Sequence, residues 1–249
     1  MARWPDGYAV RMLGSVDSTN SEAARIQRNL EAPTWIVAGM QTAGRGRRNR
    51  FWHSHSGNLF ATLAMRARGS PGNVALRSFV AALALRDASK ALAPGADIFS
   101  IKWPNDLLAG NRKFAGILLE CDSGENVGCF VRIGFGVNIA SAPGLEPSEA
   151  DAFKATSFFD ATGIYARPED YLSELAAAYA ERESQFQKAG FESIRKDWLM
   201  HAARLGETVR VNLPTESFSG VFESIDDAGR AVIDAARGRR LVAAADIFF

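Results

Sequence analysis

Residues 44–54, GRGRRNRFWHS, place four arginines within six positions, beside glycines and an aromatic pair. The glycines let backbone N–H groups approach an anion closely, and guanidinium groups pair in a fork with phosphate or carboxylate. The stretch lacks the lysine and hydroxyl that follow the last glycine of a phosphate-binding loop. Taken alone, it is explained about equally well as a solvated basic loop.

A second polar stretch, KWPNDLL at residues 102–108, interrupts apolar sequence. Lys102 ends an expected strand, and Asn105 and Asp106 then project from a proline-containing turn. Lys113 opens another expected strand eleven residues after Lys102. Two lysines and an aspartate at strand ends suit a polyanion and a metal ion, although an ordinary strand-ending turn is the alternative.

Three glycines occur inside apolar strand segments, namely Gly116 in KFAGILLE and Gly134 and Gly136 in GFGVN. Glycine weakens the interior of a strand, so a β-bulge is one explanation of Gly134 and Gly136. The other is close approach of a flat ligand to the backbone. Asn138 would then supply an amide edge of the kind that adenine accepts.

Apolar periodicity and turn residues predict the elements that hold these stretches. Strands are expected at 35–41, 58–67, 98–103, 113–122 and 129–139, and helices at 74–92, from Pro168 to 186, and at about 190–203. A helix is also expected to follow DSTN at residues 17–20, with Thr19 and Glu22 at capping-box spacing. Short alternating segments after Gly206 predict a small all-β module with a barrel-like form. The fold class is α+β.

Composition excludes several classes of protein. The 249 residues carry 29 basic and 28 acidic side chains, a balance that argues against a dedicated duplex-DNA binder. No apolar run approaches the roughly 20 residues of a membrane span, and no signal peptide is evident. Cys121 and Cys129 lack CxxC spacing and fit a reducing cytosol. His53, His55 and His201 form no metal-ligand pattern with them, so we expect no structural zinc.

Four stretches together resemble the biotin protein ligases in order and spacing. They are DSTN at 17–20, QTAGRGRRNRFWHS at 41–54, KWPND with KFAGILLE at 102–120, and IGFGVNI at 133–139. The resemblance covers about residues 10 to 249, because the C-terminal module is similar to the SH3-like domain of that family. Only 16 residues precede DSTN, so the form without the N-terminal helix-turn-helix of bifunctional members is expected.

The resemblance implies a catalytic domain at residues 1–204, built on a mixed β-sheet with flanking helices, and an SH3-like β-barrel at 205–249. It also implies condensation of biotin with ATP to biotinyl-5′-adenylate, with Mg²⁺, and transfer to a lysine of a biotin carboxyl carrier domain. A cytoplasmic monomer or homodimer without nucleic-acid or membrane partners is expected.

Site residues follow from the resemblance by motif. Those implied for catalysis are Lys113, Arg47, Asp106 and Arg45. Those implied for biotin are Ser18, Thr19, Asn20, Gln41, Gly44, Arg45, Gly46, Arg47, Trp52, Lys113 and Gly116. Those implied for ATP are Arg47, Arg48, Arg50, Lys102, Asn105, Lys113, Gly134, Gly136 and Asn138. Asp106 would orient or deprotonate the acceptor lysine, or hold Mg²⁺; no metal site built of protein ligands is predicted.

One position departs from the pattern, since the family usually has glycine where this chain has Asn49. Asparagine tolerates a positive φ, so we expect the loop to keep its shape with Asn49 in that conformation. Two alternative functions remain. A lipoate ligase or octanoyltransferase would share the fold, and a nucleic-acid-binding module could stack bases on Phe51 and Trp52.

Overall fold

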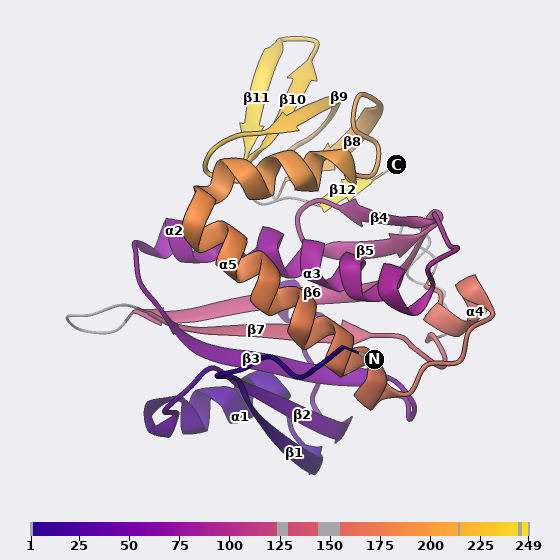
Figure 1. The fold of residues 1–249 in the computed structure, drawn as a ribbon. Helices are drawn as coiled ribbons and strands as arrows, with labels where there is room; N and C mark the ends of the chain where they lie inside the picture. Colours follow the sequence, from indigo (N-terminus) through magenta and orange to yellow (C-terminus); the bar gives the residue numbers. More distant parts are fainter. Residues whose placement is uncertain (1, 124–128, 144–154, 214, 244–245, 249) are drawn as a thin grey trace.

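The protein combines a large mixed sheet with helices and a smaller second sheet (Figure 1). The structure, a computed structural model, describes residues 2–123, 129–143, 155–213, 215–243 and 246–248. The large sheet has seven strands in the order β1-β2-β3-β7-β6-β5-β4. Only β1 and β2 pair in parallel, whereas the other neighbours are antiparallel. The predicted α+β class is confirmed.

The bounds of the elements are as follows. The large sheet contains β1 (Ala9–Val16), β2 (Thr34–Gln41), β3 (Leu59–Ala67), β4 (Phe99–Lys102), β5 (Asp106–Ala109), β6 (Arg112–Ser123) and β7 (Cys129–Val137). The helices are α1 (Thr19–Ile26), α2 (Pro71–Ala75), α3 (Arg77–Leu92), α4 (Phe158–Thr162) and α5 (Pro168–Met200), with 3₁₀ turns η1 (Gln27–Asn29) and η2 (Arg47–Asn49). None of these described helices is apolar over a length that would cross a membrane.

Five predicted strands are present, and two further strands were not predicted. Strand β1 lies at the edge of the sheet with most of its residues exposed, so it carries no apolar alternation. Strand β5 has only four residues and begins at Asp106, which the sequence placed in a turn. The two predicted C-terminal helical segments form one element, α5, with a break at Gly190, whose φ is 72°.

The capping box predicted at Thr19 is wrong. Ser18 is the N-cap of α1, with extended backbone, and its side chain makes no capping hydrogen bond among the described residues. The Thr19 backbone N–H instead donates to Oε1 of Gln41, 22 residues away, at 2.8 Å. The capping-box pattern assigned the Thr19 N–H to the end of the helix, whereas in the structure this N–H makes a long-range contact with Gln41.

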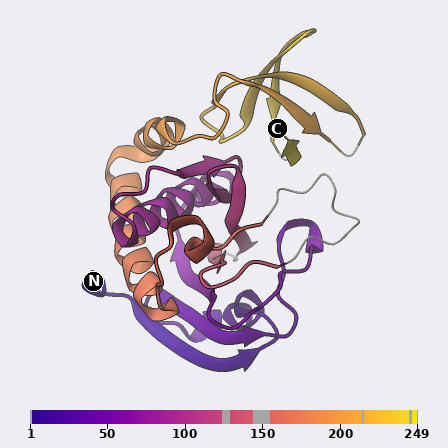
Figure 2. The same cartoon turned by 90° about the vertical axis from the view of Figure 1, so that its right-hand side faces the viewer.

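The two faces of the large sheet are covered by different helices. Trp35 and Val37 on β2 belong to the main core, which α3 and α5 complete. Ile36, between them, packs instead with Ala23 of α1. Because successive strand residues point to opposite faces, α1 lies on the face opposite α3 and α5. Figures 1 and 2 show this layering, with the long α5 running across its own side of the sheet.

An ion pair is buried between α3 and α5. Nη2 of Arg77 lies 2.7 Å from Oε1 of Glu183, and both side chains are almost fully buried. The hydroxyl of Tyr179 donates to the second carboxylate oxygen at 3.3 Å. Burial, together with the charge of Glu183, raises the pKa of Tyr8 to about 12 and that of Tyr179 well above its ordinary value. These phenols stay neutral beside the carboxylate.

The C-terminal module is a five-stranded antiparallel sheet in the order β11-β10-β9-β8-β12. Its strands are β8 (Thr208–Asn212), β9 (Ser217–Ile225), β10 (Ala231–Ala235), β11 (Gly238–Val242) and β12 (Asp246–Phe248). The predicted all-β module is confirmed, although no pairing between β11 and β12 closes it into a barrel within the described segments. Figure 2 shows it beyond the end of α5.

The module contacts the main body through the turn after β9. The indole N–H of Trp103 donates to the carbonyl of Gly229 at 3.0 Å. Gly229 has a φ of 75°, and a Cβ there would lie 2.6 Å from a ring carbon of Phe79. Glycine is therefore required both by the backbone conformation and by the close packing. The contact holds the KWPND segment against the second sheet.

We expect Glu183→Ala to lower the free energy of unfolding by about 3–5 kcal/mol, because it leaves the Arg77 guanidinium buried without its carboxylate. Urea denaturation followed by circular dichroism measures the change. The matched control is Glu181→Ala on the exposed side of α5, which should change stability by less than about 0.5 kcal/mol. A loss below about 1 kcal/mol for Glu183→Ala, as for a surface pair, would contradict the buried-pair account.

Candidate functional site

A cavity of about 280 Å³ opens on the α1 face of the large sheet. It is lined by Ser18, Thr19, Asn20, Gln41, Arg45, Gly46, Arg47, Arg48, Arg50, Phe51, Trp52, His53, Lys102, Asn105, Asp106, Lys113, Gly116, Ile117, Leu118, Gly134, Phe135, Gly136, Asn138, Pro143 and Ala155. Every predicted site residue except Gly44 is among them. The carbonyl of Gly44 accepts from the Trp52 backbone N–H at 2.9 Å, so Gly44 supports the wall behind the lining.

Glycines form the floor of this cavity. Gly116 on β6 and Gly136 on β7 are direct cross-strand partners, and the pairing of these strands has no register shift. Gly134 and Gly136, for which a bulge was the alternative, therefore mark no bulge. A Cβ at Gly136 would lie 2.4 Å from the Trp52 indole, and one at Gly134 would lie 2.5 Å from Oδ1 of Asn20. Protein side chains make the close approach that the sequence analysis assigned to a flat ligand.

Trp52 lies across this floor and forms part of the wall. The Lys113 Nζ atom lies 5.5 Å from the centre of its ring, within the range of a cation–π contact. Its indole nitrogen is buried and has no hydrogen-bond partner among the described residues. The predicted position of Trp52 beside the ligand space is consistent with this placement.

The arginine segment folds back on itself as a tight loop. Arg45 bridges to Phe51, and the Gly46 N–H donates to the carbonyl of Arg50 at 2.7 Å. Arg48, the residue before Asn49, has a positive φ of 55° with a ψ of 31°. The chain thus has a left-handed residue at the centre of η2. The positive φ expected at Asn49 stays a prediction.

Two loop arginines are held by partners on the sheet and on α1. Nη1 of Arg47 donates to Oδ1 of Asn105 at 3.1 Å. The Asn105 amide in turn donates to the carbonyl of Ile117 on β6. Arg45 lies 3.6 Å from the carboxylate of Glu120 and donates to the Ser21 hydroxyl at 3.3 Å. The loop is thus attached to β6 in two places.

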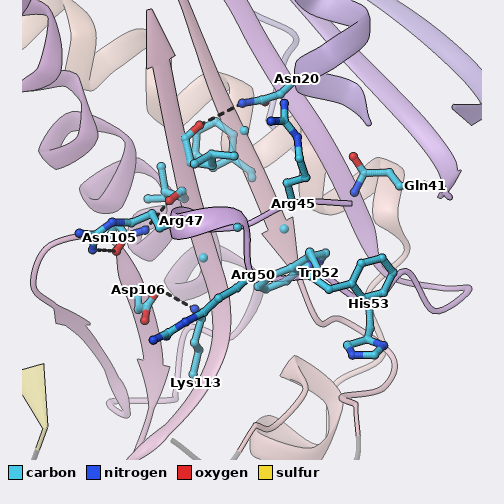
Figure 3. A pocket seen from close by; sticks show the side chains of 18 of the residues that line it. Asn20, Gln41, Arg45, Arg47, Arg50, Trp52, His53, Asn105, Asp106 and Lys113 are labelled. Atoms are coloured by element: carbon cyan, nitrogen blue, oxygen red, sulfur yellow. Dashed lines mark hydrogen bonds and ion pairs between the residues drawn. The ribbon is translucent and has the colours of Figure 1, made fainter. Parts of the chain in front are cut away.

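Lys113 and Asp106 form an ion pair at one end of the cavity, with Nζ 2.7 Å from Oδ1 and both side chains partly buried. Lys102 is the cross-strand partner of Asp106 in the β4–β5 hairpin and also lines the cavity. In Figure 3, Asp106 and Lys113 face each other at one end, while Asn20 and Gln41 lie at the other. The Asp106–Lys113 pair therefore marks one end of the cavity, the charged end, and amide and hydroxyl groups mark the other, the neutral end, which the Arg45 guanidinium also approaches.

The neutral end is built at the start of α1. Ser18, Thr19 and Asn20 are all buried there. The C-terminal end of this helical segment is fixed by Gln27, whose amide donates to the carboxylate of Asp122 at 2.7 Å. The guanidinium of Arg132 hydrogen-bonds the same carboxylate and, with Gln27, lowers the pKa of Asp122 to about 2. This network sets where the polar residues of α1 lie.

Asn138 is held by protein partners on both sides. Its backbone N–H donates to the carbonyl of Phe114 at 2.8 Å, and its side-chain amide donates to the carbonyl of Thr156 at 3.3 Å. Sequence reasoning missed Phe51, His53, Ile117, Leu118, Phe135, Pro143 and Ala155 as lining residues. Leu118 could have been found, because it lies two residues from Gly116 on the same strand face.

Comparisons with known proteins identify the family of the chain. Residues 13–138 match the biotin/lipoate A/B protein ligase family, and residues 205–249 match the biotin protein ligase C terminal domain. The chain is 43% identical to a biotin--[acetyl-CoA-carboxylase] ligase of Paracoccus denitrificans, over 96% of this chain and 99% of the relative. It is 31% identical to the bifunctional ligase/repressor BirA of Bacillus subtilis, over 95% of this chain and 71% of the relative.

Among solved structures, the chain is similar to a biotin protein ligase from Aquifex aeolicus in complex with biotin and ATP. The TM-score is 0.80 at 24% identity, covering 96% of this chain and 97% of the other, which shows a shared fold. A biotin protein ligase from Leishmania major in complex with biotinyl-5-AMP has a TM-score of 0.68 at 22% identity, covering 96% and 100%. On the sequence matches and the architecture together, the chain belongs to the biotin protein ligases, within the biotin/lipoate A/B protein ligase family.

Proposed function

We propose that the protein activates biotin with ATP and transfers it to a lysine of a biotin carboxyl carrier domain. A carboxylate oxygen of biotin attacks the α-phosphorus and diphosphate leaves, giving biotinyl-5′-adenylate. The acceptor amine then attacks the acyl carbon, AMP leaves, and the amine loses a proton. The observation that carries the proposal is a single cavity with neutral hydrogen-bonding groups at one end and cations at the other.

The neutral end suits the ureido ring of biotin, which needs both donors and acceptors. Thr19 and Gln41 supply them, and Ser18 lies beside them. The dithiolane ring of lipoate has no N–H or C=O group to pair with these buried atoms. Leaving buried polar groups unpaired costs roughly 1–3 kcal/mol each, so the same end disfavours lipoate.

The charged end suits the reacting groups. Lys113 meets the biotin carboxylate and the α-phosphate there, and its charge offsets the negative charge that develops in the transition state. Arg45 approaches the biotin carboxylate from the α1 side, where it contacts Ser21 and Glu120. Arg47, Arg48 and Arg50 approach the phosphates. Lys102, Asn105, Asn138 and the glycine backbone of β7 complete the nucleotide end.

Asp106 is the only carboxylate among the described lining residues, and Lys113 already holds it. We infer that Asp106 orients Lys113 and then the acceptor amine, whose proton its carboxylate can accept. Mg²⁺ commonly binds through one or two carboxylates together with substrate phosphates. The alternative role for Asp106 is to hold Mg²⁺ carried by ATP, because it is the one carboxylate that the described lining offers. When bound, the ion neutralises charge on the leaving diphosphate.

The domain division is proposed at residues 204 and 205. It is supported by the change from helix to short strands after Met200 and by the start of the C-terminal family match at residue 205. A cytoplasmic location suits the two cysteines, which are free thiols. The carrier domain is the proposed partner, with the enzyme acting as a monomer or homodimer.

The activity is tested by incubating the protein with ATP and Mg²⁺, with and without biotin. We expect AMP and diphosphate only when biotin is present, and biotin attached to a carrier domain when one is added. Lipoate in place of biotin serves as the control ligand. Diphosphate release that does not depend on biotin would overturn the proposal.

Lys113→Ala should lower the rate of adenylate formation by roughly 10²-fold or more, about 3 kcal/mol, since it removes charge stabilisation in the transition state. The affinity for biotin should change less, because the ring is bound at the other end of the cavity. Rapid-quench measurement of adenylate tests this, with Lys188→Ala, an exposed lysine on α5, as the matched control. An unchanged rate would remove Lys113 from the catalytic residues.

Residues 45–50 should be cut by limited proteolysis in the free protein and protected by biotin with ATP. Neighbouring like charges repel in the absence of phosphate, whereas bound phosphates pair with them and favour one ordered loop. Mass spectrometry of the fragments locates the cuts, and ATP alone is the control. Equal cutting with and without both ligands would show that the loop does not close on them.

A further inference from the structure

A buried hydroxyl outside the cavity contacts two of its lining residues. Thr62 on β3 is fully buried and pairs across the sheet with Gly134. Its Oγ1 lies 2.8 Å from the Thr19 hydroxyl and 2.6 Å from Oδ1 of Asn20. It therefore connects the first two residues of α1 to the centre of the sheet.

The directions of these hydrogen bonds follow from the acceptors around Asn20. The Asn20 nitrogen lies 3.1 Å from the Glu120 carboxylate and 3.4 Å from the carbonyl of Leu118, two groups that only accept. The amide oxygen must then face Thr62, and because it cannot donate, Thr62 donates its single proton to it. Asn20 thus has acceptors for its amide hydrogens within the protein.

Thr19 is fixed in turn. The Thr19 hydroxyl has two acceptors within reach, the Thr62 hydroxyl at 2.8 Å and Oε1 of Gln41 at 3.2 Å. With the Thr62 proton given to Asn20, the shorter of these two contacts is a hydrogen bond only when Thr19 donates to Thr62. The hydroxyl oxygen of Thr19 is left with lone pairs only. Oε1 of Gln41 accepts from the Thr19 backbone N–H at 2.8 Å, so the other end of the Gln41 amide carries the donors. The cavity therefore presents a hydrogen-bond acceptor, the Thr19 hydroxyl oxygen, beside a donor, the side-chain N–H of Gln41.

We propose that Thr62 is a positioning residue that sets this hydrogen-bond polarity and so selects a ring with N–H beside C=O, as in a cyclic urea. The inference rests on the proposed function in that biotin supplies the urea. Thr62 acts through Thr19 and Asn20 and does not itself line the cavity. Without the Thr62 hydroxyl, Asn20 loses a donor, and the Thr19 proton is released to turn to Oε1 of Gln41, 3.2 Å away, or into the cavity.

The test is Thr62→Val, which keeps the shape of the side chain and removes the hydroxyl. The Kd for biotin by calorimetry and the KM for biotin should rise by about tenfold or more, as for buried polar groups left unpaired. The kcat for adenylate formation at saturating biotin should stay within about threefold, because ground-state binding is affected most. The KM for ATP should not change. Thr62→Ser should restore the affinity for biotin.

The matched control is Thr34→Val, a buried threonine on β2 whose hydroxyl donates to the carbonyl of Ala32, away from the cavity. It should leave the Kd for biotin unchanged. A second readout uses the two biotin analogues in which one or the other ureido N–H is replaced by a ring oxygen. In the wild type, the analogue in which oxygen replaces the N–H that faces Thr19 should bind more weakly than biotin. In Thr62→Val this difference should be smaller, because the Thr19 proton is no longer held by Thr62 and turns between Oε1 of Gln41 and the ring oxygen.

If wild type binds no biotin, the proposed function fails. If wild type binds biotin and Thr62→Val binds it equally well, with the same preference over both analogues, the proposal for Thr62 fails alone. A parallel loss in the KM for biotin, the KM for ATP and kcat would indicate a general structural role and also overturn it. Thermal denaturation checks folding, and Thr62→Ala takes the place of Thr62→Val should that variant not fold.

Discussion

The absence of side chains at three positions in the middle of the large sheet is the constraint on which the site depends. Gly116, Gly134 and Gly136 leave the backbone of β6 and β7 open on the α1 face. Trp52 and Asn20 lie so close to it that a methyl group at Gly136 or Gly134 would overlap them. The positions of the Trp52 and Asn20 side chains therefore depend on the glycine floor. This floor lies on strands, which hold a site more rigidly than loops do.

Three of the positive side chains around this floor have partners in the protein. Lys113 pairs with Asp106, Arg45 lies near Glu120, and Arg47 donates to Asn105. Each partner belongs to β5, β6 or the turn before them, so the cations are held near the sheet before any anion arrives. The near-neutral chain thereby carries a locally positive pocket, which raises the concentration of anionic ligands there. The rest of the surface has no net positive charge that would favour non-specific binding of anions.

Much of this fold could be predicted from local sequence, and the exceptions have physical causes. Long apolar strands such as β3 and β7 were found because burial on both faces leaves an uninterrupted apolar run. The edge strand β1 was missed because most of it is exposed, so neither face shows an apolar pattern. The positive φ of Arg48 was not predicted, because arginine has no special preference for that conformation and the geometry of η2 imposes it.

The site residues were predicted as a set by resemblance to a family, whereas their contacts could not be. Thr19 was assigned to a helix cap because its spacing from Glu22 is local and visible. Its actual hydrogen-bond partners are Gln41 and Thr62, which only the folded sheet brings close. Gly136 was assigned to a ligand because nothing in the sequence places Trp52 above it. Motif spacing indicates which residues meet, and the tertiary fold decides how.

The hydrogen bond between Trp103 and Gly229 also determines in which order parts of the cavity are completed during protein synthesis. The Trp103 indole N–H donates to Gly229, which follows it by 126 residues. At about 5–20 residues per second, a ribosome adds Gly229 roughly 6–25 seconds after Trp103. The strands that carry the glycine floor are complete by Val137, so the neutral end of the cavity can assemble on the nascent chain first. The hairpin bearing Lys102 and Asp106 gains its final support only as the C-terminal module emerges, which makes the charged end the last part of the pocket to be secured.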